Sequence, residues 1–167
     1  MNNEKTRAWF PKEIFWLLVL FFIQQLPLVA DWGVDLPLIF VVLVGLRSEP
    51  AQSAGWGLTA GMIQDLLSAG GIGTNAISKT IVGLASSLFK MHVYREKVLT
   101  QTSLIAAMSI FHELFVYGLM RWDGEAPRAE DAFSTCFRSV LFTTLAGLAV
   151  CFFVVRFRRR RFDPATA

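Results

Sequence analysis

Six apolar segments separated by short polar loops make up most of this 167-residue chain. A helix needs about 20 mainly apolar residues to cross the hydrocarbon core of a bilayer. Most of the segments approach or exceed that length, whereas the second has only about twelve residues and is expected to be tilted, short or partly re-entrant. The expected segments are residues 12–30, 35–46, 50–67, 74–91, 98–120 and 132–155.

Composition favours the same class of protein. Apolar residues make up 54% of the chain and charged residues 17%, and the mean hydropathy is +0.48. Both values indicate that a bilayer is the solvent. We therefore predict an all-α integral membrane protein in which residues 1–167 form one polytopic domain, a compact bundle of about six transmembrane helices.

The positions of the basic residues predict the topology. Twelve of the sixteen Lys and Arg residues fall before the first segment, at alternate loops, or after the last segment. By the positive-inside rule, these regions face the cytoplasm, and so do both termini. They include a basic N-terminal segment (1–11) and a basic C-terminal tail (156–167). Several of these residues are expected to contact anionic lipid or a partner rather than nucleic acid: Arg95, Lys97, Arg156, Arg158, Arg159, Arg160 and Arg161.

Motifs for catalysis or metal binding are not recognisable in the sequence. It has no Walker loop, nucleophile elbow or zinc-protease motif. Its two cysteines, Cys136 and Cys151, lie about 22 Å apart along one expected helix, which is too far for a disulfide. We therefore expect no enzyme activity, no cofactor and no metal site.

A glycine-rich connection joins the third and fourth segments. Gly70, Gly71 and Gly73 suit a tight turn between two helices that lie close together. Gly57 and Gly61 form a small-xxx-small pair on the preceding segment, which favours close helix packing. On the following segment, the polar and small residues recur at helical spacing along one side; they are Asn75, Lys79, Gly83, Ser86 and Lys90.

Charges inside the apolar segments need partners or access to water. Asp65 and Lys79 lie at similar depth near the outer ends of neighbouring segments, so they either form a hidden ion pair or extend separately to the headgroups. Glu113 and Arg138 also share a depth and are expected to pair. His112 lies beside Glu113, and this cluster is either a structural polar network or a proton or substrate pathway.

Gln24 and Gln25 lie near the outer end of the first segment. They either complete the outer polar zone or lie at the membrane interface.

One part of the sequence resembles a known family. The order Gly57-x-x-x-Gly61-Met-Ile-Gln-Asp65-Leu-Leu-Ser-Ala-Gly-Gly71-Ile-Gly73-Thr-Asn75 follows a short basic N-terminus and early proline-containing segments. It resembles the rod shape-determining protein MreD family, whose specific motif corresponds to residues 57–83 here. In length and topology the likeness covers nearly the whole chain.

The resemblance implies a fold similar to the substrate-binding subunits of energy-coupling-factor transporters. It also implies a non-enzymatic scaffold of the cell-elongation machinery in the bacterial cytoplasmic (inner) membrane. The implied partners are MreC, bound through the membrane helices, and the wider assembly of MreB, RodA and its penicillin-binding transpeptidase. The alternative function is a subunit of a membrane transporter that binds a small, vitamin-like solute.

Overall fold

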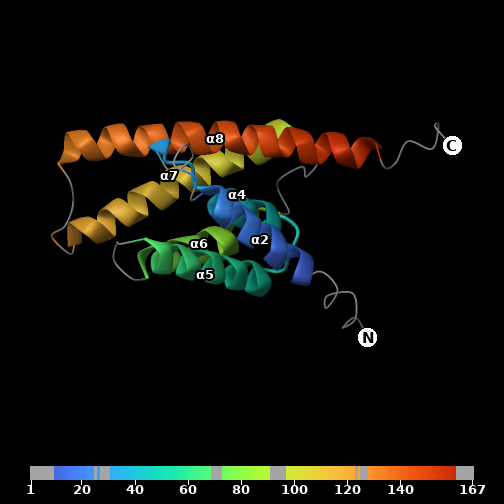
Figure 1. Ribbon diagram of the computed structural model, residues 1–167, viewed down its shortest axis with the longest axis horizontal. Helices are drawn as coiled ribbons and strands as arrows, with labels where there is room; N and C mark the ends of the chain where they lie inside the picture. Colours follow the sequence, from blue (N-terminus) through green and yellow to red (C-terminus); the bar gives the residue numbers. More distant parts are fainter. Residues whose placement is uncertain are drawn as a thin grey trace.

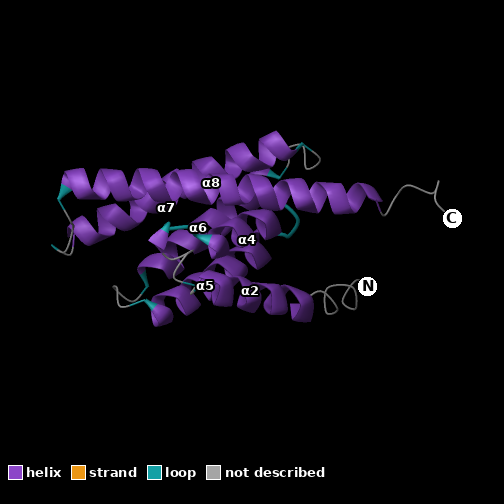
Figure 2. Ribbon diagram, turned by 45° about the horizontal axis from the view of Figure 1, so that its top comes forward, coloured by secondary structure: helices purple, strands orange, loops and turns teal. Residues whose placement is uncertain are grey.

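The computed structural model describes residues 10–24, 26, 31–68, 73–90, 97–122, 124 and 128–160. All six expected apolar segments are helices, and the described residues contain no strand (Figure 2). Of the residues singled out above, Gly70, Gly71, Arg95 and Arg161 lie outside the described residues, as does Gln25. The helices are α2 (Phe10–Gln24), α4 (Leu36–Gly45), α5 (Pro50–Leu67), α6 (Thr74–Phe89), α7 (Val98–Trp122) and α8 (Ala129–Arg160).

The helices run alternately in opposite directions along the long axis of the molecule (Figure 1). The beginning of α2 and the end of α8 lie at the same end of the bundle, on the right in Figure 1. Helices α5 and α7 end, and α6 and α8 begin, at the opposite end, on the left. This order places sequence neighbours side by side, and the closest helix pair is α5 with α6.

The short helix α4 lies at the centre of the bundle and contacts each of the other five described helices. It has ten residues, which at about 1.5 Å per residue is too short to cross a bilayer core of about 30 Å. Most of it is buried, and its Leu38, Val41 and Val42 side chains are fully enclosed. The expectation that this segment is short is therefore confirmed, and its apolar character reflects burial among other helices.

Glycines allow α5 and α6 to pack at very short distance. A Cβ atom added at Gly57 would collide with the backbone carbonyl of Lys79, and one added at Gly61 would collide with the backbone of Asn75 and Ala76. Gly83 faces the carbonyl of Ser53 in the same way. The small-xxx-small pair thus acts as expected, because backbone meets backbone where no side chain intervenes.

The last two helices are long and apolar enough to cross a membrane. The stretches concerned are Val98–Trp122 and Glu130–Phe153, and only 28% and 22% of the most apolar 18 residues in each are buried within the molecule. Helix α8 continues beyond the second of these ranges to Arg160. Residues 156–160, which were expected to belong to a C-terminal tail, therefore extend the helix.

Candidate functional site

A buried cluster of polar side chains lies where α4, α6 and α7 meet, and we refer to it as the polar junction. Its members are Asp35, Ser78, Lys79 and His112. Lys79 is the largest fully enclosed side chain among the described residues, with 0% of its surface exposed. Its Nζ donates to Oδ2 of Asp35 at 2.6 Å, which forms a buried ion pair. Each charge thus neutralises the other in a place that water does not reach.

His112 closes the polar junction from α7. Its Nδ1 lies 2.7 Å from Oγ of Ser78, and its Nε2 lies 3.4 Å from Nζ of Lys79 and 3.3 Å from Oδ2 of Asp35. Both ring nitrogens therefore have polar neighbours, as a buried imidazole requires. The junction links three helices through side chains alone.

Asp35 also begins α4. Its Oδ1 accepts from the backbone N–H of Leu38 at 3.0 Å, as an N-cap does, and the negative charge lies at the positive end of the helix. The proline at position 37 suits this first turn because it has no N–H to satisfy. The aspartate therefore stabilises α4 and Lys79 at the same time.

The backbone before α4 is anchored by neighbouring helices. The N–H of Asp35 donates to Oγ1 of Thr143 at 3.0 Å, and the N–H of Leu36 donates to Oε1 of Gln24 at 3.2 Å. The carbonyl of Gly33 accepts from Oγ of Ser139 at 2.8 Å. Three backbone polar groups around the start of α4 thus have partners on neighbouring helices, as buried backbone requires. Gln24, which was expected either in the outer polar zone or at the membrane interface, is half-buried and accepts from the backbone at the start of α4.

Asp65 does not form the ion pair with Lys79 that was considered above. Its carboxylate lies in the last turn of α5 and accepts from the beginning of α6, so Asp65 and Lys79 have separate partners. One oxygen accepts from the N–H groups of Gly73 (2.9 Å) and Ala76 (3.0 Å), and the other from the N–H (3.1 Å) and side-chain amide (2.9 Å) of Asn75. Gly73 takes a left-handed conformation with φ of 101° and has no side chain of its own to cap α6. The carboxylate supplies that cap from the neighbouring helix.

The expected Glu113–Arg138 ion pair is wrong. The carboxylate of Glu113 accepts instead from Oγ of Ser139, the residue that follows Arg138. Consecutive helical residues point about 100° apart, so a helix that turns Ser139 toward α7 turns Arg138 away from it. Ser139 is buried and Arg138 is exposed. In the described part of the chain, no ion pair joins Glu113 to a cation.

The remaining predicted residues divide between the interior and the surface. Gly57, Gly61 and Gly83 line helix contacts, as described above. Lys97 and Arg156 are exposed at the end of the bundle that holds the beginning of α2, and the side chains of Arg158, Arg159 and Arg160 lie outside the description.

Sequence reasoning overlooked Asp35 as the partner of Lys79. The Asp35-Leu36-Pro37 order was the available signal, since it is typical of an N-cap followed by proline.

Ser78, His112 and Asp35 include the residue types of a hydrolase triad, but their surroundings differ from those of an active site. Ser78 is fully buried within α6 and Lys79 contacts the Nε2 side of the imidazole. A substrate carbonyl has no path to the serine oxygen in this conformation, although a triad requires one. The described residues also contain no group of three or more His, Cys, Asp and Glu side chains that could hold a metal ion. The contacts of the polar junction instead join the beginning of α4 to α6 and α7.

Comparisons of the chain with protein families, with curated proteins and with solved structures find no match.

Proposed function

We propose that this protein is a multi-pass scaffold of the bacterial inner membrane that binds other membrane proteins and catalyses no reaction. The proposed assembly is the cell-elongation machinery, in which the chain takes the place of MreD and packs against the membrane helix of MreC. The resemblance of residues 57–83 suggests this assembly. The distribution of polar and apolar side chains supports the membrane scaffold.

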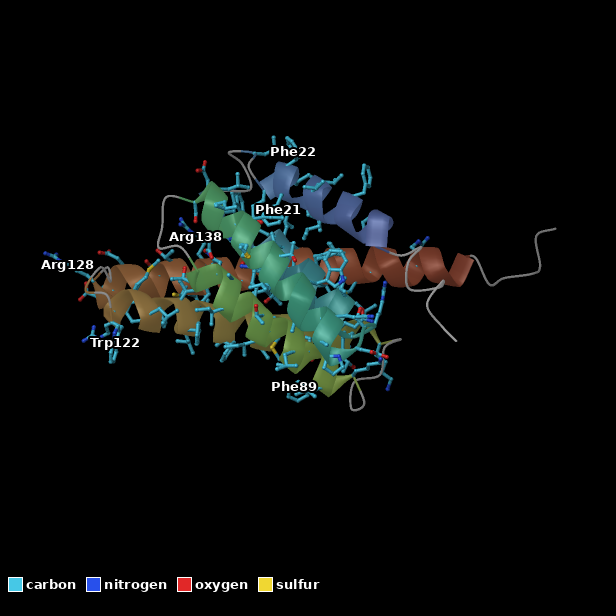
Figure 3. The ribbon with its side chains drawn as sticks, turned by 90° about the horizontal axis from the view of Figure 1, so that it is seen from below. Phe21, Phe22, Phe89, Trp122, Arg128 and Arg138 are labelled. Atoms are coloured by element: carbon cyan, nitrogen blue, oxygen red, sulfur yellow. The ribbon has the colours of Figure 1, made fainter. Side chains whose placement is uncertain are left out.

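The observation that carries the proposal is a distribution of side chains that is the reverse of a water-soluble protein's, with large apolar residues outside and polar residues inside. Large apolar residues face outward on the described helices; Phe22 is 79% exposed and Phe133 is 75% exposed. Figure 3 shows Phe22 on the outer side of α2, while its neighbour Phe21 faces the bundle. The buried polar side chains are Asp35, Ser53, Asp65, Ser78, Lys79, Ser86, Ser87, Gln101, Ser109, His112, Ser139 and Thr143. Lipid accommodates such an exterior, whereas water would not.

The proposed topology has both termini in the cytoplasm. The beginning of α2 and the end of α8 lie at one end of the bundle (Figure 1). The described residues at that end include Arg47, Lys90, Lys97 and Arg156, in keeping with the positive-inside rule. The basic run at the end of α8 is proposed to contact anionic lipid or a cytoskeletal partner.

The polar junction supports a scaffold over a solute-binding subunit. Lys79 already uses Asp35 and His112 as partners, so a solute would have to displace an existing ion pair. Association of membrane helices instead depends on close van der Waals packing between complementary surfaces. A rigid bundle with exposed apolar faces meets that requirement.

Co-purification tests the proposal. The chain is tagged, expressed at native level in its own cells, extracted in mild detergent and isolated, and the accompanying proteins are identified by mass spectrometry. MreC is the expected companion, and depletion of the protein should turn rod-shaped cells round. Recovery without any protein of the elongation machinery would contradict the assignment.

A second experiment separates scaffold from transporter. The purified protein is heated with individual vitamins, and its midpoint of unfolding is compared with that of ligand-free protein. We expect no shift. A saturable rise with one vitamin would favour the solute-binding alternative.

A further inference from the structure

Arg138 is an exposed cation, and the six residues on either side of it along α8 carry no charge. It lies within the range Glu130–Phe153, which is long and apolar enough to cross a membrane. Within the part of the chain that the structure describes, it forms no ion pair. An unneutralised guanidinium in contact with hydrocarbon is costly, so an anion from outside this chain is expected beside it.

The helix presents Arg138 directly beneath an exposed acid. Asp131 lies seven residues earlier, which places it about 10.5 Å farther out and only about 20° around the helix. Side chains on a helix lean toward its N-terminus, so the guanidinium extends from Arg138 toward Asp131 and the headgroup region. The same face therefore carries a cation at the deeper level and an anion at the shallower level.

Below Arg138 the same face is apolar. Leu141 is 44% exposed and Leu145 is 51% exposed, and they lie about 60° and about 20° around the helix from Arg138. The seven residues from Arg138 to Leu145 rise about 10.5 Å, which is about two thirds of half a bilayer core of about 30 Å. This stretch therefore covers the part of one lipid leaflet that lies nearest the headgroups.

We propose that Arg138 and Asp131 form a binding site for one zwitterionic phospholipid of the outer leaflet, with the chemistry of phosphatidylethanolamine. In such a lipid the phosphate adjoins the glycerol above the acyl chains, and the ammonium group is attached beyond the phosphate. The guanidinium donates to the phosphate through parallel N–H bonds, the ammonium faces the carboxylate of Asp131, and an acyl chain lies along the leucines.

The surrounding charges allow this arrangement. Arg128 and Glu130 are also exposed at the beginning of α8; Glu130 lies about 80° around the helix from Arg138, and Arg128 precedes the first helical residue, Ala129. Figure 3 shows Arg128 and Trp122 at the tip of the α7–α8 pair and Arg138 farther inward along α8. The lipid site thus uses two charges of opposite sign, and Arg128 provides a matched control. The inference depends on the membrane placement proposed above.

Native mass spectrometry of the full chain tests the site. Protein is reconstituted with equal amounts of phosphatidylethanolamine and phosphatidylglycerol, released in mild detergent, and scored for retained lipid. Wild type should retain one phosphatidylethanolamine, and Arg138→Ala should lower that occupancy about tenfold. Asp131→Asn should remove the preference for phosphatidylethanolamine, whereas Arg128→Ala should behave as wild type. Size-exclusion profiles establish that the exposed substitutions leave the fold intact.

Two results would overturn the lipid site. One is unchanged phosphatidylethanolamine occupancy in Arg138→Ala. The other is loss of a co-purifying protein from native membranes on the same substitution with lipid retention unchanged, which would assign Arg138 to a protein carboxylate. Failure of the wild-type chain to enter bilayers at all would instead reject the membrane placement, so the two failures are distinguishable.

Discussion

The ammonium nitrogen of Lys79 lies 2.6 Å from a carboxylate oxygen of Asp35, although the two residues are 44 positions apart in the chain. This contact ties the beginning of α4 to α6 in the interior of the bundle. Helix α4 is too short for a bilayer to hold it by length alone. The ion pair therefore helps to determine where the central helix sits.

Breaking this ion pair should destabilise the protein strongly. Lys79→Met leaves the Asp35 carboxylate buried without its cation, and we expect a loss of about 3–5 kcal/mol in the free energy of unfolding. The measurement is reversible unfolding by SDS in mixed micelles, followed by circular dichroism. The double variant Asp35→Asn/Lys79→Met removes both charges and should recover part of the loss. A loss in the double variant equal to the sum of the losses in Asp35→Asn and Lys79→Met would mean that the charges are not coupled.

Asp65 should be essential for the junction between α5 and α6. Asp65→Ala removes the acceptor for three backbone N–H groups and one side-chain amide, and we expect a loss of at least about 2 kcal/mol in the free energy of unfolding. Asp65→Asn keeps the shape and one acceptor oxygen, so it should be intermediate. Hydrogen exchange should increase at residues 73–76 before it increases in α7. Uniform exchange across both regions would argue against a local cap.

The glycines of α5 should differ according to what they face. Gly57→Ala places a methyl group against the backbone carbonyl of Lys79 and should cost about 2–3 kcal/mol, because the helices must move apart. Gly55 lies two residues earlier on the same helix and has open space at its Cβ position. Gly55→Ala should be neutral or stabilising by up to about 1 kcal/mol, since alanine favours helix. Thermal midpoints of the two purified variants provide the comparison, and similar midpoints would contradict the proposed close approach.

Ser139 should couple α7 to the segment before α4. Its hydroxyl lies against two part-buried acceptors, the carboxylate of Glu113 and the carbonyl of Gly33, and its single hydrogen serves one of them at a time, so Ser139→Ala removes the donor that they share. We expect a loss of about 1–3 kcal/mol. A double-mutant cycle with Glu113→Gln should give a coupling of at least about 0.5 kcal/mol. A matched cycle of Glu113→Gln with Arg138→Ala should give no coupling energy. Measurable coupling there would indicate that Glu113 and Arg138 form an ion pair after all.

Much of the helical framework can be predicted because it depends on local information. Apolar runs flanked by Pro, Gly and charged residues mark the helices, and α5 begins and ends where the sequence predicts. The second apolar segment is short in the sequence, and the corresponding helix α4 is short in the structure. Gly57 and Gly61 likewise indicate a close helix contact, because their spacing alone places them on one face of α5.

The pairing of charges could not be predicted in the same way. Depth along two helices was compatible with Asp65 facing Lys79 and with Glu113 facing Arg138, but depth says nothing about rotation around the helix axis. A rotation of about 100° per residue turns Ser139 inward and Arg138 outward. The true partner of Lys79 lies in the non-helical segment before α4, which periodicity does not place.

From the sequence alone, the number and order of apolar helices, their small-residue contacts and the asymmetry of basic residues can be determined, since each depends on composition and spacing within a few turns. Only the tertiary structure decided that Asp35 neutralises Lys79, that Asp65 caps α6 and that Arg138 faces outward. Those outcomes depend on how whole helices are rotated and inserted against one another. Packing of the complete bundle sets that rotation, because a buried charge is tolerated only where a partner from another helix meets it.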